Sequence, residues 1–201
     1  MEPKYKNVIF DLGNVLLEWN PQRFLKELDL PLHFLDVFHS LLWATHDGGL
    51  LTRAELVEKL PSHYDKKVFA ECINQIASFL TPIPEMIETL HEVRRNGYKA
   101  YILSNMPKEM HEELKELHDF FTFFDGQVFS YEVKAIKPQP QIYQALMNQY
   151  QLKGHESVFI DDLEMNVRAA KDLGIEGIVC KNPAQVRSEL KLLKIIYTQM
   201  T

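Results

Sequence analysis

Short apolar runs, each leading into a turn and an amphipathic segment, recur along this 201-residue chain and constrain its fold more than any other feature. The runs cover residues 8–10, 99–103, 127–129, 157–160 and 177–180. Polar residues follow four of the five runs directly. Strands that alternate with helices in this way build a parallel sheet with helices packed on it. The sequence therefore predicts an α/β fold.

Two of the helices between these runs can be placed from their ends. Pro84 suits the first position of a helix, apolar residues repeat at helical spacing as far as Val93, and Gly97 is placed to end it. Residues 164–173 show the same periodicity and are followed by Gly174. We expect both helices to pack on the sheet.

Residues 17–83 interrupt the alternation of strand and helix. They contain no clear strand, and their apolar residues repeat at helical spacing instead. This pattern predicts a helical insertion between the first and second strands. The remaining residues, 1–16 and 84–201, would then form the domain that contains the sheet.

Composition and charge limit the location and the partners of the protein. The net charge of -6 provides no general basic field for nucleic acid or anionic lipid. Cys72 and Cys180 are too few for a disulfide framework, which fits a reducing cytosol. No segment approaches the apolar length of a membrane span, and the N-terminal residues do not form a signal peptide. We expect a cytoplasmic monomer or homodimer that binds neither nucleic acid nor membrane.

Polar residues follow the apolar runs at points that a parallel sheet brings together, because its ligands bind outside the carboxyl ends of the strands. The residues expected there are Asp11, Gly13, Ser104, Asn105, Lys137, Asp161 and Asp162. Three carboxylates so close together would raise one another's pKa unless cations compensate. One Mg²⁺ ion and Lys137 would balance the three negative charges. Mg²⁺ also prefers oxygen ligands and commonly binds phosphate through one or two carboxylates.

Each of these residues also has a purely structural explanation. An Asp after a strand often forms a turn or caps a helix, and a Ser-Asn pair can do the same. Lys137 could be a solvated loop residue, and residues 161–162 could form an acidic helix start. Their shared position at one end of successive strands favours the functional interpretation.

At these positions the chain resembles the haloacid dehalogenase-like hydrolases, in the branch with a helical cap inserted after the first strand. The motifs that carry the resemblance are residues 10–15, residues 103–105, Lys137 with Pro138, and residues 160–162 with Asn166. Each motif is weak alone, but the four in this order are specific. The resemblance covers nearly the whole chain and implies a Rossmann-like parallel-sheet core with a helical cap at residues 17–83.

The resemblance also implies a Mg²⁺-dependent phosphatase that works through an aspartyl-phosphate intermediate. Asp11 would be the nucleophile that attacks phosphorus. The hydroxyl of Ser104 and the backbone N–H of Asn105 would hold the phosphoryl oxygens, and Lys137 would neutralise their charge.

A metal site accompanies this mechanism in the family that the chain resembles. Its ligands would be Asp11, the backbone carbonyl of Gly13 and Asp162, with Asp161 as a support through water or a further ligand. Asn166 would orient the acidic pair.

The chain departs from the family pattern at Gly13, where most phosphatases of this family carry a second Asp as general acid and base. Such proton transfer typically contributes roughly 10² to 10⁴ in rate. A leaving group that needs little protonation would remove the need for it. A water or a group from the insertion could also supply the proton, with Glu18, His39 and His46 as candidates.

A third answer is that the protein binds phosphorylated ligands for regulation, without turnover. A subgroup of the family with Asp-x-Gly-Asn in its first motif includes sugar-phosphate phosphatases, which favours a working enzyme for a sugar phosphate. Dehalogenation is less favoured, because the dehalogenases need no metal and residues 161–162 make sense chiefly as a metal site.

As a cap, the insertion would exclude water and select the non-phosphate part of the substrate. Its hinges would lie near residues 18–20 and 81–84. Its most irregular stretch contains Trp43, His46, Asp47 and the pair Gly48-Gly49, and a similar segment in the subgroup faces the active site. Of these, Trp43 and His46 are the candidates for substrate contact. We expect them to contact the substrate, although Trp43 could equally be a core residue.

Overall fold

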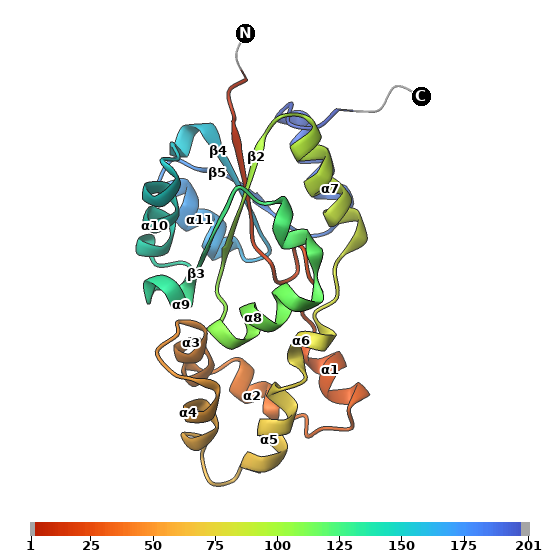
Figure 1. The fold of residues 1–201 in the computed structure, drawn as a ribbon, viewed down its shortest axis with the longest axis vertical. Helices are drawn as coiled ribbons and strands as arrows, with labels where there is room; N and C mark the ends of the chain where they lie inside the picture. Colours follow the sequence, from red (N-terminus) through yellow and green to blue (C-terminus); the bar gives the residue numbers. More distant parts are fainter. Residues whose placement is uncertain (1–2, 198–201) are drawn as a thin grey trace.

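The computed structural model describes residues 3–197, which form a five-stranded parallel sheet flanked by helices (Figure 1). The strands are β1 (Asn7–Phe10), β2 (Lys99–Ser104), β3 (Gly126–Phe129), β4 (Ser157–Asp161) and β5 (Glu176–Val179). Their order across the sheet is β3-β2-β1-β4-β5, and each neighbouring pair is parallel. The prediction of an α/β fold on a parallel sheet is confirmed.

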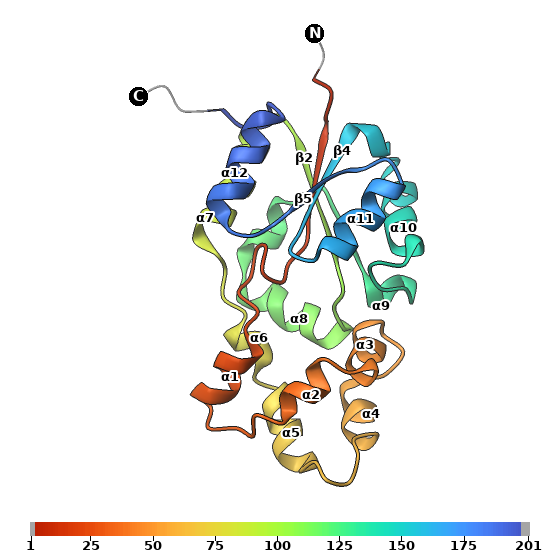
Figure 2. The ribbon, with the colours of Figure 1, turned by 180° about the vertical axis from the view of Figure 1, so that it is seen from behind.

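Helices cover both faces of the sheet (Figures 1 and 2). α10 (Pro140–Tyr150) and α11 (Glu164–Asp172) pack on one face, and α7 (Pro84–Arg95) and α12 (Pro183–Leu192) pack on the other. Successive side chains of a strand point to opposite faces. Ile9 of β1 accordingly joins the first of these apolar layers, while Val8 and Phe10 join the second.

Shorter elements complete the part of the chain that contains the sheet, which our proposed division makes the sheet domain. They are α8 (Lys108–Leu117), α9 (Ser130–Val133) and two 3-10 turns, η1 (Asp119–Phe123) and η2 (Gly154–Glu156). α8 and α9 follow β2 and β3, so they lie at the carboxyl edge of the sheet. Among residues 3–197, no helix is long and apolar enough to cross a bilayer.

Six short helices occupy residues 21–79, between β1 and α7, and we call this part the helical segment. It comprises α1 (Pro21–Glu27), α2 (Phe34–Phe38), α3 (Leu41–Asp47), α4 (Arg53–Glu58), α5 (Lys66–Ile73) and α6 (Ile76–Phe79). Side-chain caps at Asn20, Ser40, Thr52 and Asp65 begin four of them. Both views show the helical segment gathered beyond the carboxyl edge of the sheet (Figures 1 and 2).

The two connections to the helical segment run side by side. Leu17 pairs with Pro82 in an antiparallel bridge, and Glu18 N–H donates to the Thr81 carbonyl at 2.9 Å. Ile83 N–H donates to the Leu16 carbonyl at 2.8 Å. These contacts adjoin the expected hinges. The division into a sheet domain and a cap at residues 17–83 remains our proposal.

Candidate active site

The carboxyl ends of the central strands bring the polar residues of the first, second and fourth motifs together. Asp11 directly follows β1, Ser104 ends β2 and Asp161 ends β4. In the sheet, Phe10 of β1 is aligned with Ile102 of β2 and with Ile160 of β4, so the residues that follow them lie near one another. A cavity of about 360 Å³ lies between the sheet and the helical segment, and Asp11, Ser104 and Asp162 line it.

Lys137 joins this group from the loop between α9 and α10. Its Nζ lies 2.7 Å from Oδ1 of Asp11 and 2.6 Å from Oδ2 of Asp161, and all three side chains are almost fully buried. Burial alone would lower the pKa of Lys137, but the two carboxylates outweigh it and raise the pKa above its ordinary value. Lys137 is therefore held in its charged form.

Asp11 sits in an environment that resists a negative charge. Burial raises its pKa to about 6, Lys137 acts to lower it, and the neighbouring Asp161 acts to raise it. A hydrogen bond from Ser104 also favours the ionised form. Additional positive charge at this point would therefore stabilise the carboxylate.

Asp161 is committed to contacts within the protein. Its Oδ1 accepts hydrogen bonds from Leu163 N–H and from Nδ2 of Asn166, both at 2.9 Å, while its Oδ2 binds Lys137. Asp162 is less constrained: it is partly exposed, and its Oδ2 accepts one hydrogen bond, at 3.0 Å, from Nδ2 of Asn14. Burial raises the pKa of Asp162 as well.

The acidic residues are close enough to share one cation. Carboxylate oxygens of Asp11, Asp161 and Asp162 all lie within 4.8 Å of one another. The three negative charges face only the single positive charge of Lys137 at this cluster, counted over residues 3–197. A hard divalent cation with oxygen ligands fits both the donor atoms and this charge deficit.

The side chain of Asn105 fixes the loop that carries Lys137. Its Oδ1 accepts from Lys137 N–H at 2.7 Å, and its Nδ2 donates to the Lys137 carbonyl at 3.2 Å. The peptide bond between Lys137 and Pro138 is cis. Asn105 also lines the cavity.

The helical segment supplies the opposite wall of the cavity. Of the two residues expected there, Trp43 lines the cavity and His46 does not. Trp43 and Asp47 of α3 line the cavity, as does the exposed His39. His46 does not; its ring is buried, and Nδ1 lies 2.8 Å from the Leu51 carbonyl. Adjacent residues of a helix point about 100° apart, so the turn that buries His46 directs Asp47 to the cavity.

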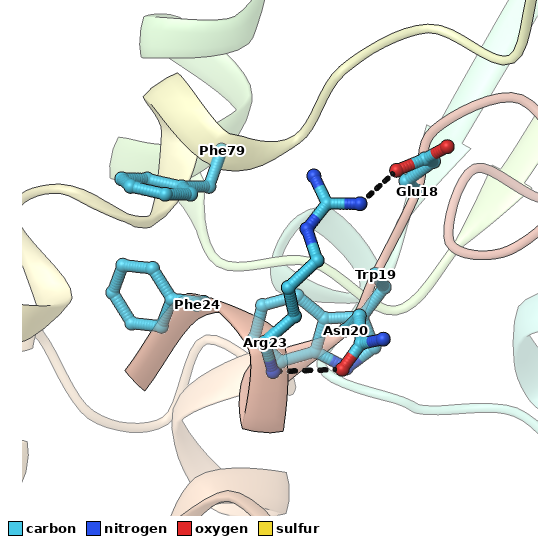
Figure 3. Close-up of a pocket in the computed structure, with 6 residues that line it drawn as sticks. All are labelled: Glu18, Trp19, Asn20, Arg23, Phe24 and Phe79. Carbon is cyan, nitrogen blue, oxygen red and sulfur yellow. Dashed lines mark hydrogen bonds and ion pairs between the residues drawn. The ribbon is translucent and has the colours of Figure 1, made fainter. Parts of the chain in front are cut away.

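Glu18, another expected proton source, is engaged elsewhere. Figure 3 shows its carboxylate paired with the guanidinium of Arg23, with Nη1 and Oε2 2.8 Å apart. The two residues line a separate cavity of about 10 Å³, roughly the space for one water molecule. Glu18 therefore does not face the site that contains Asp11.

Several cavity residues did not emerge from the sequence as site candidates. They include Asn14, Leu17, Leu80, Met106 and Met110, while Asp47 was named only as part of the irregular stretch of the insertion. Asp47 carried a detectable signal, because it lies four residues after Trp43 and so on the same helical face. The position of Leu80 depends on how the helical segment meets the sheet, which the sequence pattern does not define.

Comparisons with known proteins agree with this geometry. A family model of haloacid dehalogenase-like hydrolases matches residues 5–174. A sesquiterpene phosphatase of Aspergillus oryzae is 28% identical over 196 residues, which cover 94% of this chain and 96% of the relative. A phosphorylated carbohydrates phosphatase of Thermotoga maritima is 28% identical over 180 residues, covering 85% of this chain and 82% of the relative.

A solved structure is similar over most of the molecule. It is a haloacid dehalogenase-family enzyme of Bacteroides thetaiotaomicron in complex with magnesium and inorganic phosphate. The two chains are 25% identical with a TM-score of 0.72, and the match covers 88% of this chain and 94% of the other. The parallel sheet, the four motifs at its carboxyl edge and the family match lead to one conclusion: this chain is a hydrolase of the haloacid dehalogenase-like family, with phosphatases among its relatives.

Proposed function

We propose that this protein is a Mg²⁺-dependent phosphatase that hydrolyses a small phosphorylated metabolite through a phosphorylated Asp11. The observation that carries the proposal is the buried contact of Lys137 with Asp11 and Asp161, with Asp162 beside them at the wall of the cavity. A carboxylate that faces a fixed cation in a cavity is suited to attack an anionic phosphoryl group.

Asp11, Asp162 and the backbone carbonyl of Gly13 would hold the metal. Asp161 would support it indirectly, because both of its oxygens already accept hydrogen bonds within the protein. Bound there, Mg²⁺ would neutralise charge on the phosphoryl oxygens and fix their orientation. Asn166 would keep Asp161 in place through its 2.9 Å hydrogen bond.

The phosphoryl group would be held by residues of the second and third motifs. The Ser104 hydroxyl and the Asn105 backbone N–H would donate hydrogen bonds to its oxygens, and Lys137 would offset its charge. Asp11 would then attack phosphorus, and water would release phosphate from the aspartyl-phosphate in a second step.

The first substrate class to test is sugar phosphates. The first motif with Gly13 and Asn14 favours this class, and a relative that covers most of the chain is a phosphorylated carbohydrates phosphatase. Trp43 would contact the sugar from the helical segment, and it stacks on Trp19 at a ring distance of 6.5 Å. His46 would act indirectly, by packing against Trp43.

A second candidate class rests on the apolar side of the cavity. Its apolar lining there includes Leu17, Trp19, Trp43, Leu80, Met106 and Met110. This surface suits a phosphate ester with an apolar organic group, and the relative from Aspergillus oryzae is a sesquiterpene phosphatase.

The test is phosphate release from a panel of sugar phosphates and isoprenoid phosphates, with 4-nitrophenyl phosphate as the activated reference. We expect turnover that requires Mg²⁺ and stops when a chelator is added. Thermal stabilisation by these ligands without any phosphate release would instead support a non-hydrolytic binding protein. Halide release from 2-haloacids without added metal would support a dehalogenase.

A further inference from the structure

Among the described residues around the sheet, residues 3–16 and 84–197, none that lines the cavity is left to donate the proton that the proposed chemistry needs. Gly13 stands where a second Asp would protonate the leaving group, and the carboxylates that remain, on Asp11, Asp161 and Asp162, are committed to the nucleophile and the metal site. If a side chain supplies the proton, it would therefore reach the cavity from the helical segment. Glu18 and His46 are excluded, because the first is paired with Arg23 outside the cavity and the second is buried against Leu51.

Two ionisable residues of the helical segment do line the cavity, and they differ in position. His39 follows the short helix α2 and is exposed to solvent. Asp47 is the last residue of α3, is partly buried and shares the cavity wall with Asp11, Ser104 and Lys137.

Contacts with the sheet domain fix Asp47 at this place. The Ser130 hydroxyl of α9 donates to the Asp47 backbone carbonyl and accepts from Met106 N–H at 2.8 Å. Two residues further along, the Gly49 carbonyl accepts from Lys134 Nζ at 2.5 Å. The end of α3 is thus tied to both loops that carry the phosphate-binding residues.

The carboxyl group of Asp47 also has the electrostatic setting of a proton carrier. Among residues 3–197 no Lys, Arg or His forms an ion pair with it, although the nearby Trp43 indole favours its ionised form and acts to lower its pKa. Burial raises the pKa of Asp47 well above its ordinary value, while the nearby Asp11 acts to raise it and Lys137 to lower it. The protonated carboxylic acid is therefore favoured relative to an exposed Asp.

We infer that Asp47 is the general acid and base of the reaction, supplied by the helical segment in place of the residue missing at Gly13. This inference rests on the proposed phosphatase function and names a catalytic residue for it. The proton for the leaving group would come from the Asp47 carboxyl group, which reaches the cavity only when α3 lies against α9.

The proton balance of both steps follows from this assignment. As an Asp11 oxygen forms a bond to phosphorus, the bond from phosphorus to the leaving oxygen breaks. That oxygen keeps the bonding electron pair and takes the Asp47 proton to become an alcohol. In the second step the Asp47 carboxylate accepts a proton from the attacking water, phosphate leaves, and Asp11 and Asp47 return to their starting forms.

The test compares how strongly turnover depends on the leaving group. Phenyl phosphate and 4-nitrophenyl phosphate have the same shape near phosphorus, but phenolate is the stronger base and needs protonation more. We expect Asp47→Asn to lower kcat/KM for phenyl phosphate by roughly 10² or more, and by a clearly smaller factor for 4-nitrophenyl phosphate. Equal losses on both substrates would overturn the inference, because they would indicate a binding or structural role.

A second variant keeps the inference testable if Asp47→Asn disturbs the docking of α3. A Cβ atom at Gly13 would meet only Trp19 Cβ, at 3.8 Å, so Gly13→Asp fits without strain. We expect Gly13→Asp to restore hydrolysis of phenyl phosphate in the Asp47→Asn background. A large gain in the wild-type protein would overturn the inference, since it would show that no proton donor was in place.

Matched variants separate this inference from its alternatives. Glu18→Gln removes a carboxylate that lies outside the cavity, and we expect the wild-type dependence on the leaving group. If His39→Gln, rather than Asp47→Asn, selectively impairs phenyl phosphate, His39 is the donor and the inference fails. Absence of turnover in the wild-type protein on all substrates would contradict the phosphatase proposal itself, a result distinct from each of these.

Discussion

Lys137 is the residue on which the charge balance of the site depends most. Its ammonium group contacts two buried carboxylates, and its side chain is 2% exposed. Removing one partner of a buried ion pair is far more costly than losing an exposed pair, because the remaining charges stay buried without compensation.

The first prediction is therefore that Lys137→Met lowers the free energy of unfolding by about 3 to 5 kcal/mol and abolishes phosphate release. Added Mg²⁺ should recover part of the lost stability, since it compensates the same carboxylates. Urea denaturation with and without Mg²⁺ measures both effects. As a control, Lys153→Met removes an exposed lysine 3.9 Å from Glu156, and we expect it to lower the free energy of unfolding by at most about 1 kcal/mol. Similar losses in the two variants would contradict the charge balance proposed for the site.

The sequence predicted the residues at the strand ends because their positions follow from the fold alone. Asp11, Ser104 and Asp161 each lie at the end of an apolar run, and a parallel sheet brings such ends to one edge. The pairing of the Asn105 side chain with the Lys137 backbone could not be predicted in this way. It depends on the path of a loop that has no periodic pattern.

At the scale of single elements, α8 contains a buried residue that the site does not use. The Nδ1 atom of His111 lies 3.1 Å from the Tyr131 hydroxyl, and its ring lies 3.9 Å from that of Phe129. Its Nε2 is the one buried side-chain nitrogen or oxygen without a hydrogen-bond partner among residues 3–197. Burial, with a smaller contribution from Lys115, lowers the pKa of His111 from 6.5 to about 4.

The second prediction follows from this lowered pKa. Between pH 6.5 and 4, the unfolded chain binds a proton at His111 and the folded protein does not, so stability falls as the pH falls. The contribution reaches about 3 kcal/mol at the acidic end of this range. We expect His111→Phe to reduce the pH dependence of the unfolding free energy in this window, as measured by urea denaturation at several pH values. An unchanged pH dependence would show that His111 titrates normally in the folded protein.

The helices of the helical segment illustrate what periodicity can and cannot predict. Apolar spacing indicated helices within residues 17–83, and six helices occupy residues 21–79. Periodicity fixes which residues share a face of a helix, but not what that face contacts. Both Trp43 and His46 were therefore expected at the cavity, whereas the docking of α3 on α9 brings Trp43 and Asp47 there.

At the scale of the whole molecule, the helical segment is held against the sheet domain by a two-pronged ion pair. The guanidinium of Arg53 in α4 donates to both carboxylate oxygens of Glu113 in α8, at 2.7 and 3.0 Å. Arg53 N–H also donates to Glu109 at 3.2 Å. Arg53 and Glu109 lie near enough to His46 of α3 to act on its pKa, so these contacts hold the part of the helical segment that brings Asp47 to the cavity.

The third prediction concerns this ion pair. Arg53→Gln should raise KM for 4-nitrophenyl phosphate roughly fivefold, because a partly exposed pair contributes about 1 kcal/mol to the closed arrangement. Glu113→Gln should raise KM by the same factor, and the double variant should raise KM little more than either single variant does. Arg23→Gln is the matched control, since Arg23 pairs with Glu18 and Glu27 and does not bridge the two parts. If the two single effects on KM multiply in the double variant, the two residues act independently and the prediction is wrong.

The central claim is that Asp11 becomes phosphorylated during turnover, and acid quenching of the working enzyme tests it most directly. Wild-type protein would be mixed with Mg²⁺ and a substrate carrying a radiolabelled phosphoryl group, quenched, digested and mapped. The account predicts label on the peptide that contains Asp11, with neither label nor phosphate release in Asp11→Asn. Phosphate release by Asp11→Asn at the wild-type rate would contradict it.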